Sequence, residues 1–194
     1  MTDAPAPPAP VTHTPNGTPV IGIVGWKQAG KTTLTTRLIA HFAAGGLRVA
    51  SVKHAHHALS VDDGATDSAR HRASGASQVA VASSRLWAII TETPGSDEPD
   101  LAMLLAKLDP ADLCIVEGFK TSNLRKIEAR RAASDAHTAL LGTVPNVVAI
   151  ATDRPGGADN ASETRGSVPE FDLDDIAGLA AFIVELTGCR SPGP

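Results

Sequence analysis

Hydrophobic and polar positions along the chain divide it into short apolar runs and amphipathic segments. Residues 19–25, 112–118 and 146–153 are apolar runs that end in glycine or in polar residues, which is typical of strands buried on both faces of a parallel sheet. Residues 31–46 carry apolar side chains at helical spacing and end at two glycines. A further strand-like run covers residues 47–54. The order strand, loop, helix, strand predicts a βαβ unit.

The rest of the chain continues the α/β pattern. Residues 77–83 and 86–92 are strand-like and joined by a short link, which predicts an antiparallel hairpin and therefore a mixed sheet. We expect helices at 100–109 and 172–188, a strand at 126–131 and a loop at 156–166. The predicted fold is α/β, with a mostly parallel sheet, a β-hairpin extension and helices on both faces. We expect a disordered lead-in at residues 1–18, a single domain at 19–188 and a tail at 189–194.

Composition and charge narrow the function classes. The 194 residues carry a formal net charge of −4, which argues against nucleic-acid binding because phosphate neutralisation needs a basic face. No apolar run approaches the ~20 residues of a membrane span. The first residues lack the basic and apolar regions of a signal peptide, and the two cysteines form no CxxC pair. We therefore expect a cytoplasmic protein that binds no membrane.

The segment GWKQAGKT matches the P-loop pattern G-x-x-x-x-G-K-[ST] at every fixed position. A buried strand precedes it and a helix follows, so a nucleoside triphosphate site is favoured over a chance match in a glycine-rich turn. Lys31 is expected to reach the β- and γ-phosphates, and Thr32 to place its hydroxyl on Mg²⁺. The expected nucleotide-binding residues of this segment are Gly25, Trp26, Lys27, Gln28, Ala29, Gly30, Lys31, Thr32 and Thr33. The fold class is accordingly that of a P-loop NTPase.

A second element of such a site is the run DLCIVEG at 112–118. Four apolar residues followed by Glu117 are typical of a Walker B strand, whose acid meets Mg²⁺ directly or through water. We expect this strand beside the first one. The alternative is an acid that merely ends a strand.

Five segments occur together in the order GWKQAGKTTL, VASVKHAHH, VDDGATDSARHRASGA, VASSRLWAIITETP and DLCIVEGFK. Over roughly residues 20–186 they resemble the molybdopterin-guanine dinucleotide biosynthesis protein B (MobB) family. The resemblance implies a GTP-binding P-loop protein of the class that includes nickel-insertion GTPases. It implies a weak GTPase, a homodimer and an adaptor to the guanylyltransferase that joins GMP to molybdopterin, with molybdopterin itself as a possible ligand. Two positions depart from the family pattern: Gly64-Ala65 replaces a Pro-Gly turn, and Arg125 stands where many members have proline.

Histidines and acids after the second strand are further candidates. Lys53, His54, His56 and His57 end this strand; they could bind a transition metal, phosphates or a pterin, or form only a polar strand end. Asp62 and Asp67 could hold Mg²⁺ or orient water on a switch loop, and Asp67 could instead cap a helix. The expected catalytic residues are Lys31, Glu117, Asp62 and Asp67, and the expected Mg²⁺ ligands are Thr32, Glu117 and Asp62.

The remaining candidates are basic residues, the polar end of the strand-like run at 146–153, and a tryptophan. Arg70 and Lys120 could meet phosphate or a partner's acidic surface, although Arg70 could also belong to a solvated helix face. Thr152 and Asp153 follow an apolar run; an aspartate there could accept from the guanine base or begin a turn. Trp87 could be a core or an interface anchor.

We expect slow GTP hydrolysis, because no arginine finger or catalytic glutamine is evident in the sequence. Three other functions use the same motifs. A metallochaperone-type GTPase would bind metal through the histidines, and a small-molecule kinase or ligase would turn over faster with an acceptor. In a binding scaffold the nucleotide would be structural.

Overall fold

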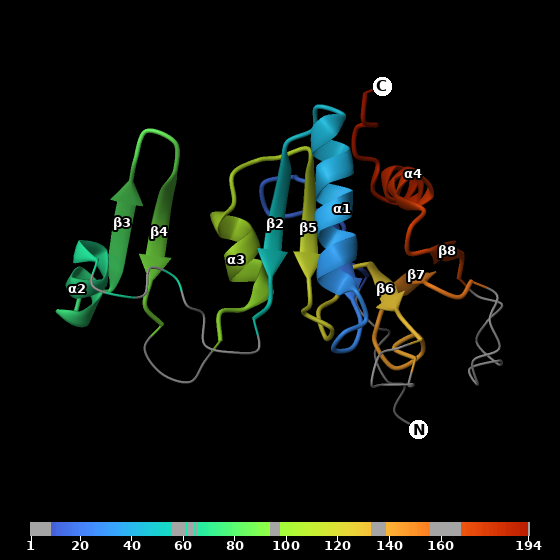
Figure 1. Ribbon diagram of the computed structural model, residues 1–194, viewed down its shortest axis with the longest axis horizontal. Helices are drawn as coiled ribbons and strands as arrows, with labels where there is room; N and C mark the ends of the chain where they lie inside the picture. The colour runs from blue at the N-terminus through green and yellow to red at the C-terminus, as the bar shows by residue number, and fades with distance from the viewer. Residues whose placement is uncertain are drawn as a thin grey trace. The chain divides into compact units, whose positions relative to one another are not determined.

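The computed structural model describes residues 9–55, 61, 64, 66–93, 98–132, 139–155 and 168–193. The chain divides into two compact units, one formed by residues 1–54 and 101–194 and the other by residues 55–100. Figure 1 labels the helices and strands of both units. Among the described residues, no helix is long and apolar enough to cross a membrane.

The larger unit is built on a six-stranded parallel sheet with the order β2-β5-β1-β6-β7-β8. Its strands are β1 (Val20–Val24), β2 (Val49–Lys53), β5 (Leu113–Glu117), β6 (Lys126–Arg130), β7 (Val147–Thr152) and β8 (Glu170–Asp172). The prediction that the strand ending in Glu117 lies beside the first strand is confirmed. The three-residue strand β8 was not predicted, because so short a segment carries no periodic pattern.

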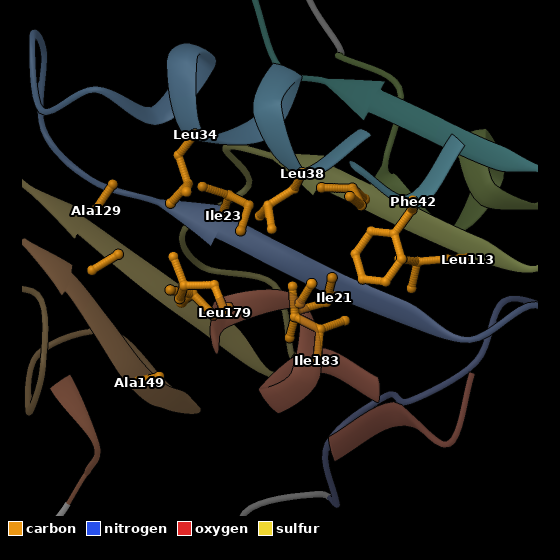
Figure 2. Close-up of a cluster of buried hydrophobic side chains, with 14 of the residues drawn as sticks. Ile21, Ile23, Leu34, Leu38, Phe42, Leu113, Ala129, Ala149, Leu179 and Ile183 are labelled. Carbon is orange, nitrogen blue, oxygen red and sulfur yellow. The ribbon is translucent and has the colours of Figure 1, made fainter. Parts of the chain in front are cut away.

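Helices cover both faces of this sheet. The helices α1 (Lys31–Ala44) and α4 (Ile176–Thr187) pack on one face, and α3 (Leu101–Lys107) packs on the other. Figure 2 shows how Ile21 and Ile23 of β1 meet the α1 and α4 side chains. Val20 of β1 instead joins the opposite cluster with Leu105 of α3. Because successive side chains of β1 enter two cores, the sequence of this strand is apolar throughout.

The smaller unit holds α2 (Asp67–Ala73), β3 (Gln78–Ala82) and β4 (Trp87–Thr91). The two strands form the predicted antiparallel hairpin. The prediction of a mixed sheet is wrong, because the hairpin is a sheet of its own and every pairing of the large sheet is parallel. A short link between two strands indicates that they pair with each other, and it does not indicate which sheet they join.

The predicted boundaries of the lead-in, the domain and the tail stay predictions. Residues 9–18 fall in the predicted lead-in. There the backbone of Val11 forms a bridge with Leu124, and Thr14 and Thr18 are buried. The loop predicted at 156–166 lies outside the described residues.

Candidate nucleotide-binding site

The predicted nucleotide site lies at the carboxyl edge of the six-stranded sheet. The P-loop joins the end of β1 to the start of α1. Because the sheet is parallel, the ends of β2, β5, β6 and β7 reach the same edge, where ligands bind in open α/β sheets. The loop therefore lies among the ends of neighbouring strands.

Gly25 begins the loop at a point where no side chain fits. A Cβ atom at this position would lie 2.5 Å from the carbonyl oxygen of Ala129 in β6. The glycine therefore lets the loop leave β1 close against the backbone of the next strand, as the tight path of a P-loop requires.

The loop ends at an exposed helix start. Gly30 is the N-cap of α1 in a left-handed conformation (φ 87°), and no side chain caps the helix. The first turn contains no acid. By contrast, the Thr66 side chain caps α2 and the Asp175 side chain caps α4. The uncapped N–H groups of α1 and its positive dipole end can therefore bind an anion.

Thr32, Glu117 and Lys53 meet beside the loop. The Thr32 hydroxyl donates a hydrogen bond to Oε1 of Glu117 at 2.6 Å. The Lys53 ammonium lies 3.4 Å from the same oxygen and donates to the Thr32 hydroxyl at 3.3 Å. The parallel pairing of β2 with β5 sets Lys53 opposite Glu117. The sequence predicted that Thr32 and Glu117 lie together, but it did not predict the contact of Lys53, because that contact depends on β2 being the neighbour of β5.

Three lysines concentrate positive charge here. Lys31 donates to the Trp26 carbonyl oxygen at 2.7 Å, and the Lys120 ammonium lies 3.8 Å from the centre of the Trp26 ring. Burial, followed by the neighbouring Lys120, lowers the pKa of Lys31; Glu117 acts in the opposite sense and Lys53 lowers it further. Burial also lowers the pKa of Lys120. Desolvated cations that repel one another favour an anionic ligand, and a polyphosphate supplies that charge.

Thr32 and Glu117 fit a magnesium ion. Both offer oxygen donors, which Mg²⁺ prefers, and a bound Mg²⁺ takes its other ligands from water and phosphate. The Glu117 residue is 6% exposed, yet among the described residues the contacts of its carboxylate are all on Oε1. When bound, the ion would neutralise phosphate charge.

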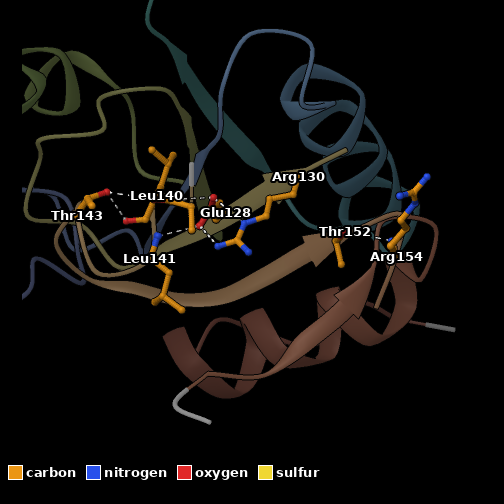
Figure 3. Close-up of polar contacts among 8 residues, drawn as sticks. Glu128, Arg130, Leu140, Leu141, Thr143, Thr152 and Arg154 are labelled. Carbon is orange, nitrogen blue, oxygen red and sulfur yellow. Dashed lines mark hydrogen bonds and ion pairs between the residues drawn. The ribbon is translucent and has the colours of Figure 1, made fainter. Parts of the chain in front are cut away.

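The strand β6 carries a second buried acid. Glu128 accepts two hydrogen bonds from the Arg130 guanidinium, at 2.8 and 2.9 Å. It also accepts the backbone N–H groups of Leu140 and Leu141, both at 2.9 Å (Figure 3). The two backbone bonds from Leu140 and Leu141 tie the segment after residue 139 to the sheet.

The predicted base-reading residues are engaged with backbone groups. The Thr152 hydroxyl accepts the N–H of Arg154 at 3.2 Å (Figure 3). The Asp153 carboxylate accepts the N–H of Ala132 at 3.0 and 3.3 Å. The role of both residues in base selection stays a prediction.

Three other predicted residues belong to the smaller unit. Asp67 and Arg70 belong to the smaller unit and form an exposed ion pair at 3.4 Å with each other. The helix cap predicted for Asp67 is wrong, because the Thr66 side chain accepts from Ala69 and so caps this helix. Asp67 occupies the first turn instead. Trp87 is 64% exposed, so it is not part of the core.

The histidine cluster is described only in part. His54 follows β2 and its ring lies against Phe119, with ring centres 4.7 Å apart. His56, His57 and Asp62 lie outside the described residues. Within the described residues, no group of three or more metal-ligating side chains gathers. The metal and ligand roles of these residues stay predictions.

Comparisons with known proteins identify the family. The family model for molybdopterin guanine dinucleotide synthesis protein B, MobB, matches residues 20–153. The chain belongs to the MobB family. It is 38% identical to the molybdopterin-guanine dinucleotide biosynthesis adapter protein of Escherichia coli K12, over 86% of this chain and 92% of the relative. The adapter protein of Haemophilus influenzae Rd is 36% identical, over 87% and 89%.

Solved MobB structures share the fold. A crystal structure of molybdopterin-guanine biosynthesis protein B is 28% identical, with a TM-score of 0.64, and the match covers 86% of this chain and 99% of that one. A MobB homologue from Bacillus stearothermophilus gives a TM-score of 0.59 at 27% identity, over 86% and 98%. The predicted α/β fold class and the family resemblance are confirmed.

Proposed function

We propose that the protein is a GTP-binding adapter in the biosynthesis of molybdopterin guanine dinucleotide. It would act beside the guanylyltransferase that joins GMP to molybdopterin, with a molybdopterin-type cofactor as a possible ligand. Family membership supports the pathway, since the E. coli and H. influenzae relatives are both named adapter proteins of this biosynthesis. The choice of GTP rests on the family resemblance.

The main support for a nucleotide site is the contact between the P-loop region and the end of β5. Thr32 at the start of α1 lies 2.6 Å from Glu117, 85 residues later in the chain. The pair sits beside an uncapped helix start and a desolvated lysine, Lys31. These groups supply the donors, the dipole and the magnesium ligands that a nucleoside triphosphate needs.

Hydrolysis is expected to be slow. The groups at the P-loop neutralise charge: Lys31 and Lys53 are cations near the Glu117 carboxylate, and Lys120 adds positive charge near Lys31. Binding and charge stabilisation alone do not activate a water molecule. We expect a partner to supply that function if rapid turnover is needed, and an intrinsic rate on the order of 1 s⁻¹ or above, as in kinases, would contradict this part of the proposal.

A homodimer formed through the hairpin fits the smaller unit. Leu86, Trp87 and Ile89 are 72%, 64% and 53% exposed, and Ala80 lies opposite Ile89 on the same face. A two-stranded hairpin is marginally stable alone and leaves both its edges unpaired, so a second copy would cover this face. Analytical ultracentrifugation should show a dimer that Trp87→Ser with Ile89→Ser dissociates. The exposed-methionine variant Met103→Ser should stay dimeric, and a wild-type monomer would contradict the proposal.

Reconstitution tests the adapter role. Purified guanylyltransferase, molybdenum-loaded molybdopterin and limiting Mg-GTP are mixed with wild type, Lys31→Ala or the surface control Lys107→Ala. We expect wild type and Lys107→Ala to raise the yield of guanine dinucleotide cofactor, and Lys31→Ala to leave it at the level without adapter. Equal yields with and without the wild-type protein would overturn the role.

A further inference from the structure

Arg131 occupies the carboxyl edge of the sheet beside the P-loop. It directly follows β6, which pairs with β1 in parallel. A Cβ atom built on Gly30 would lie 2.8 Å from Nε and 3.3 Å from Cζ of Arg131. The guanidinium therefore lies on the glycine that starts α1, and a side chain at position 30 would displace it.

The charged side chains of β6 itself form hydrogen bonds within the fold. The Lys126 ammonium is fully buried and donates to the carbonyl oxygens of Ser122, Leu124 and Pro145. Glu128 and Arg130 satisfy each other at 2.8 and 2.9 Å. By contrast, Arg131 is exposed, and its guanidinium makes no hydrogen bond or ion pair within the described chain. Among the charged residues from Lys126 to Arg131, Arg131 is therefore the one whose charged group forms no such contact within the described chain.

The backbone next to Arg131 is held in place. Asp153, which follows β7, accepts the N–H of Ala132 through both carboxylate oxygens. This contact fixes the first residue after Arg131 against the neighbouring strand end. The carboxylate thus orients the segment that presents the guanidinium to the P-loop.

We propose that Arg131 binds the α- and β-phosphates of the nucleotide in the P-loop, and that Asp153 is its positioning residue. The inference rests on the proposed function, since it needs a nucleotide in this site. Gly30 belongs to the backbone that cradles the α- and β-phosphates, and Arg131 lies against it. The Thr32–Glu117 pair lies toward β5 on the other side of β1. Arg131 therefore contacts the phosphates that di- and triphosphates share, and its planar fork suits two phosphate oxygens.

Calorimetric titrations with Mg-GDP and Mg-GTP test the arginine. Arg131→Ala should weaken both affinities by the same factor, roughly ten- to hundredfold for a lost charge-assisted hydrogen bond. Arg131→Lys should recover part of this loss. Arg48→Ala, which removes an exposed arginine just before β2 at the opposite edge of the sheet, should bind as wild type.

The outcomes separate the two proposals. If wild type binds neither nucleotide, the proposed function falls and this inference falls with it. If wild type binds and Arg131→Ala binds equally well, only the arginine inference is overturned. A loss confined to Mg-GTP would also overturn it, because the guanidinium would then meet the γ-phosphate.

Asp153 variants distinguish positioning from base recognition. Asp153→Asn keeps an oxygen that can accept from Ala132, so it should bind Mg-GTP almost as wild type with an unchanged preference over Mg-ATP. Asp153→Ala should weaken binding, by less than Arg131→Ala, and should add nothing in the Arg131→Ala background. If Asp153→Asn loses its preference for GTP over ATP, the carboxylate reads the base and its positioning role is wrong.

Discussion

The strands β5 and β6 flank β1 on opposite sides, and each carries a buried glutamate toward the carboxyl edge of the sheet. Glu128 in β6 accepts four hydrogen bonds that engage both of its oxygens. Glu117 in β5 makes its contacts through Oε1, with Thr32 and Lys53, among the residues that the structure describes. One carboxylate is saturated by the fold, and the other keeps an oxygen for a ligand. Burial alone therefore does not distinguish a structural acid from a functional one.

Lys126 and Lys31 differ in the same way as the two glutamates. Lys126 is fully buried and donates to three carbonyl oxygens. Lys31 at the P-loop donates to one carbonyl oxygen, that of Trp26. Three acceptors use the full donor capacity of an ammonium group, and one acceptor leaves two donors for phosphate. In both pairs, the number of partners that the fold supplies separates the two roles.

Removal of the saturated acid should have the largest effect on stability. Glu128→Ala removes an acceptor of the Arg130 guanidinium and of two backbone N–H groups. We expect it to lower the free energy of unfolding by about 3–5 kcal/mol, as when one partner of a buried pair is removed. Urea denaturation followed by circular dichroism measures this, with the exposed acid Glu185→Ala as control. A loss of unfolding free energy below about 1 kcal/mol would contradict the structural role of Glu128.

Neutralising the other acid should affect binding instead. Glu117→Gln keeps the size of the side chain and removes the charge that Mg²⁺ needs. We expect roughly ten- to hundredfold weaker Mg-GTP binding and a change in unfolding free energy below about 1 kcal/mol. GTP titrations with Mg²⁺ and with a chelator measure the difference. Equal affinities of the two proteins for Mg-GTP, or a stability loss as large as that of Glu128→Ala, would contradict the assignment.

The buried lysine predicts a smaller, pH-dependent effect. Burial lowers the pKa of Lys126 to about 8, below its usual value of 10.5. Above pH 8 the folded protein therefore holds fewer protons than the unfolded chain, so the free energy of unfolding should rise with pH. The rise is clearest between about pH 8 and 9 and amounts to about 1 kcal/mol. Above pH 9 the Cys114 thiol opposes it, because burial raises its pKa to about 11.

Lys126→Met provides the comparison for this rise. The variant is expected to be less stable throughout, since three carbonyl oxygens lose their donor, and to show a smaller increase between pH 8 and 9 than wild type. Urea denaturation curves at closely spaced pH values measure both properties. The same increase in the variant and in wild type would assign it to another group.

The sequence was sufficient to predict the features that depend on local patterns of residues. Continuous apolar runs identified β1 and β5, and the fixed spacing of the P-loop located Lys31 and Thr32. What it could not predict depends on tertiary neighbours. Lys53 contacts Glu117 because β2 pairs with β5, and Arg131 meets Gly30 because β6 lies beside β1. The sequence shows Arg131 only as a basic residue at the end of a strand. Its position beside the P-loop follows from the strand order, which the sequence does not show.

Calorimetric titration of Mg-GTP into wild type, Lys31→Ala and Lys107→Ala tests most directly whether the P-loop holds a nucleoside triphosphate. Both substitutions remove one lysine, and Lys107 lies exposed at the end of α3. We predict that wild type and Lys107→Ala bind with equal affinity and that Lys31→Ala binds roughly a hundredfold more weakly or gives no heat. Equal binding by Lys31→Ala, or no binding by wild type, would contradict a nucleotide site in this loop.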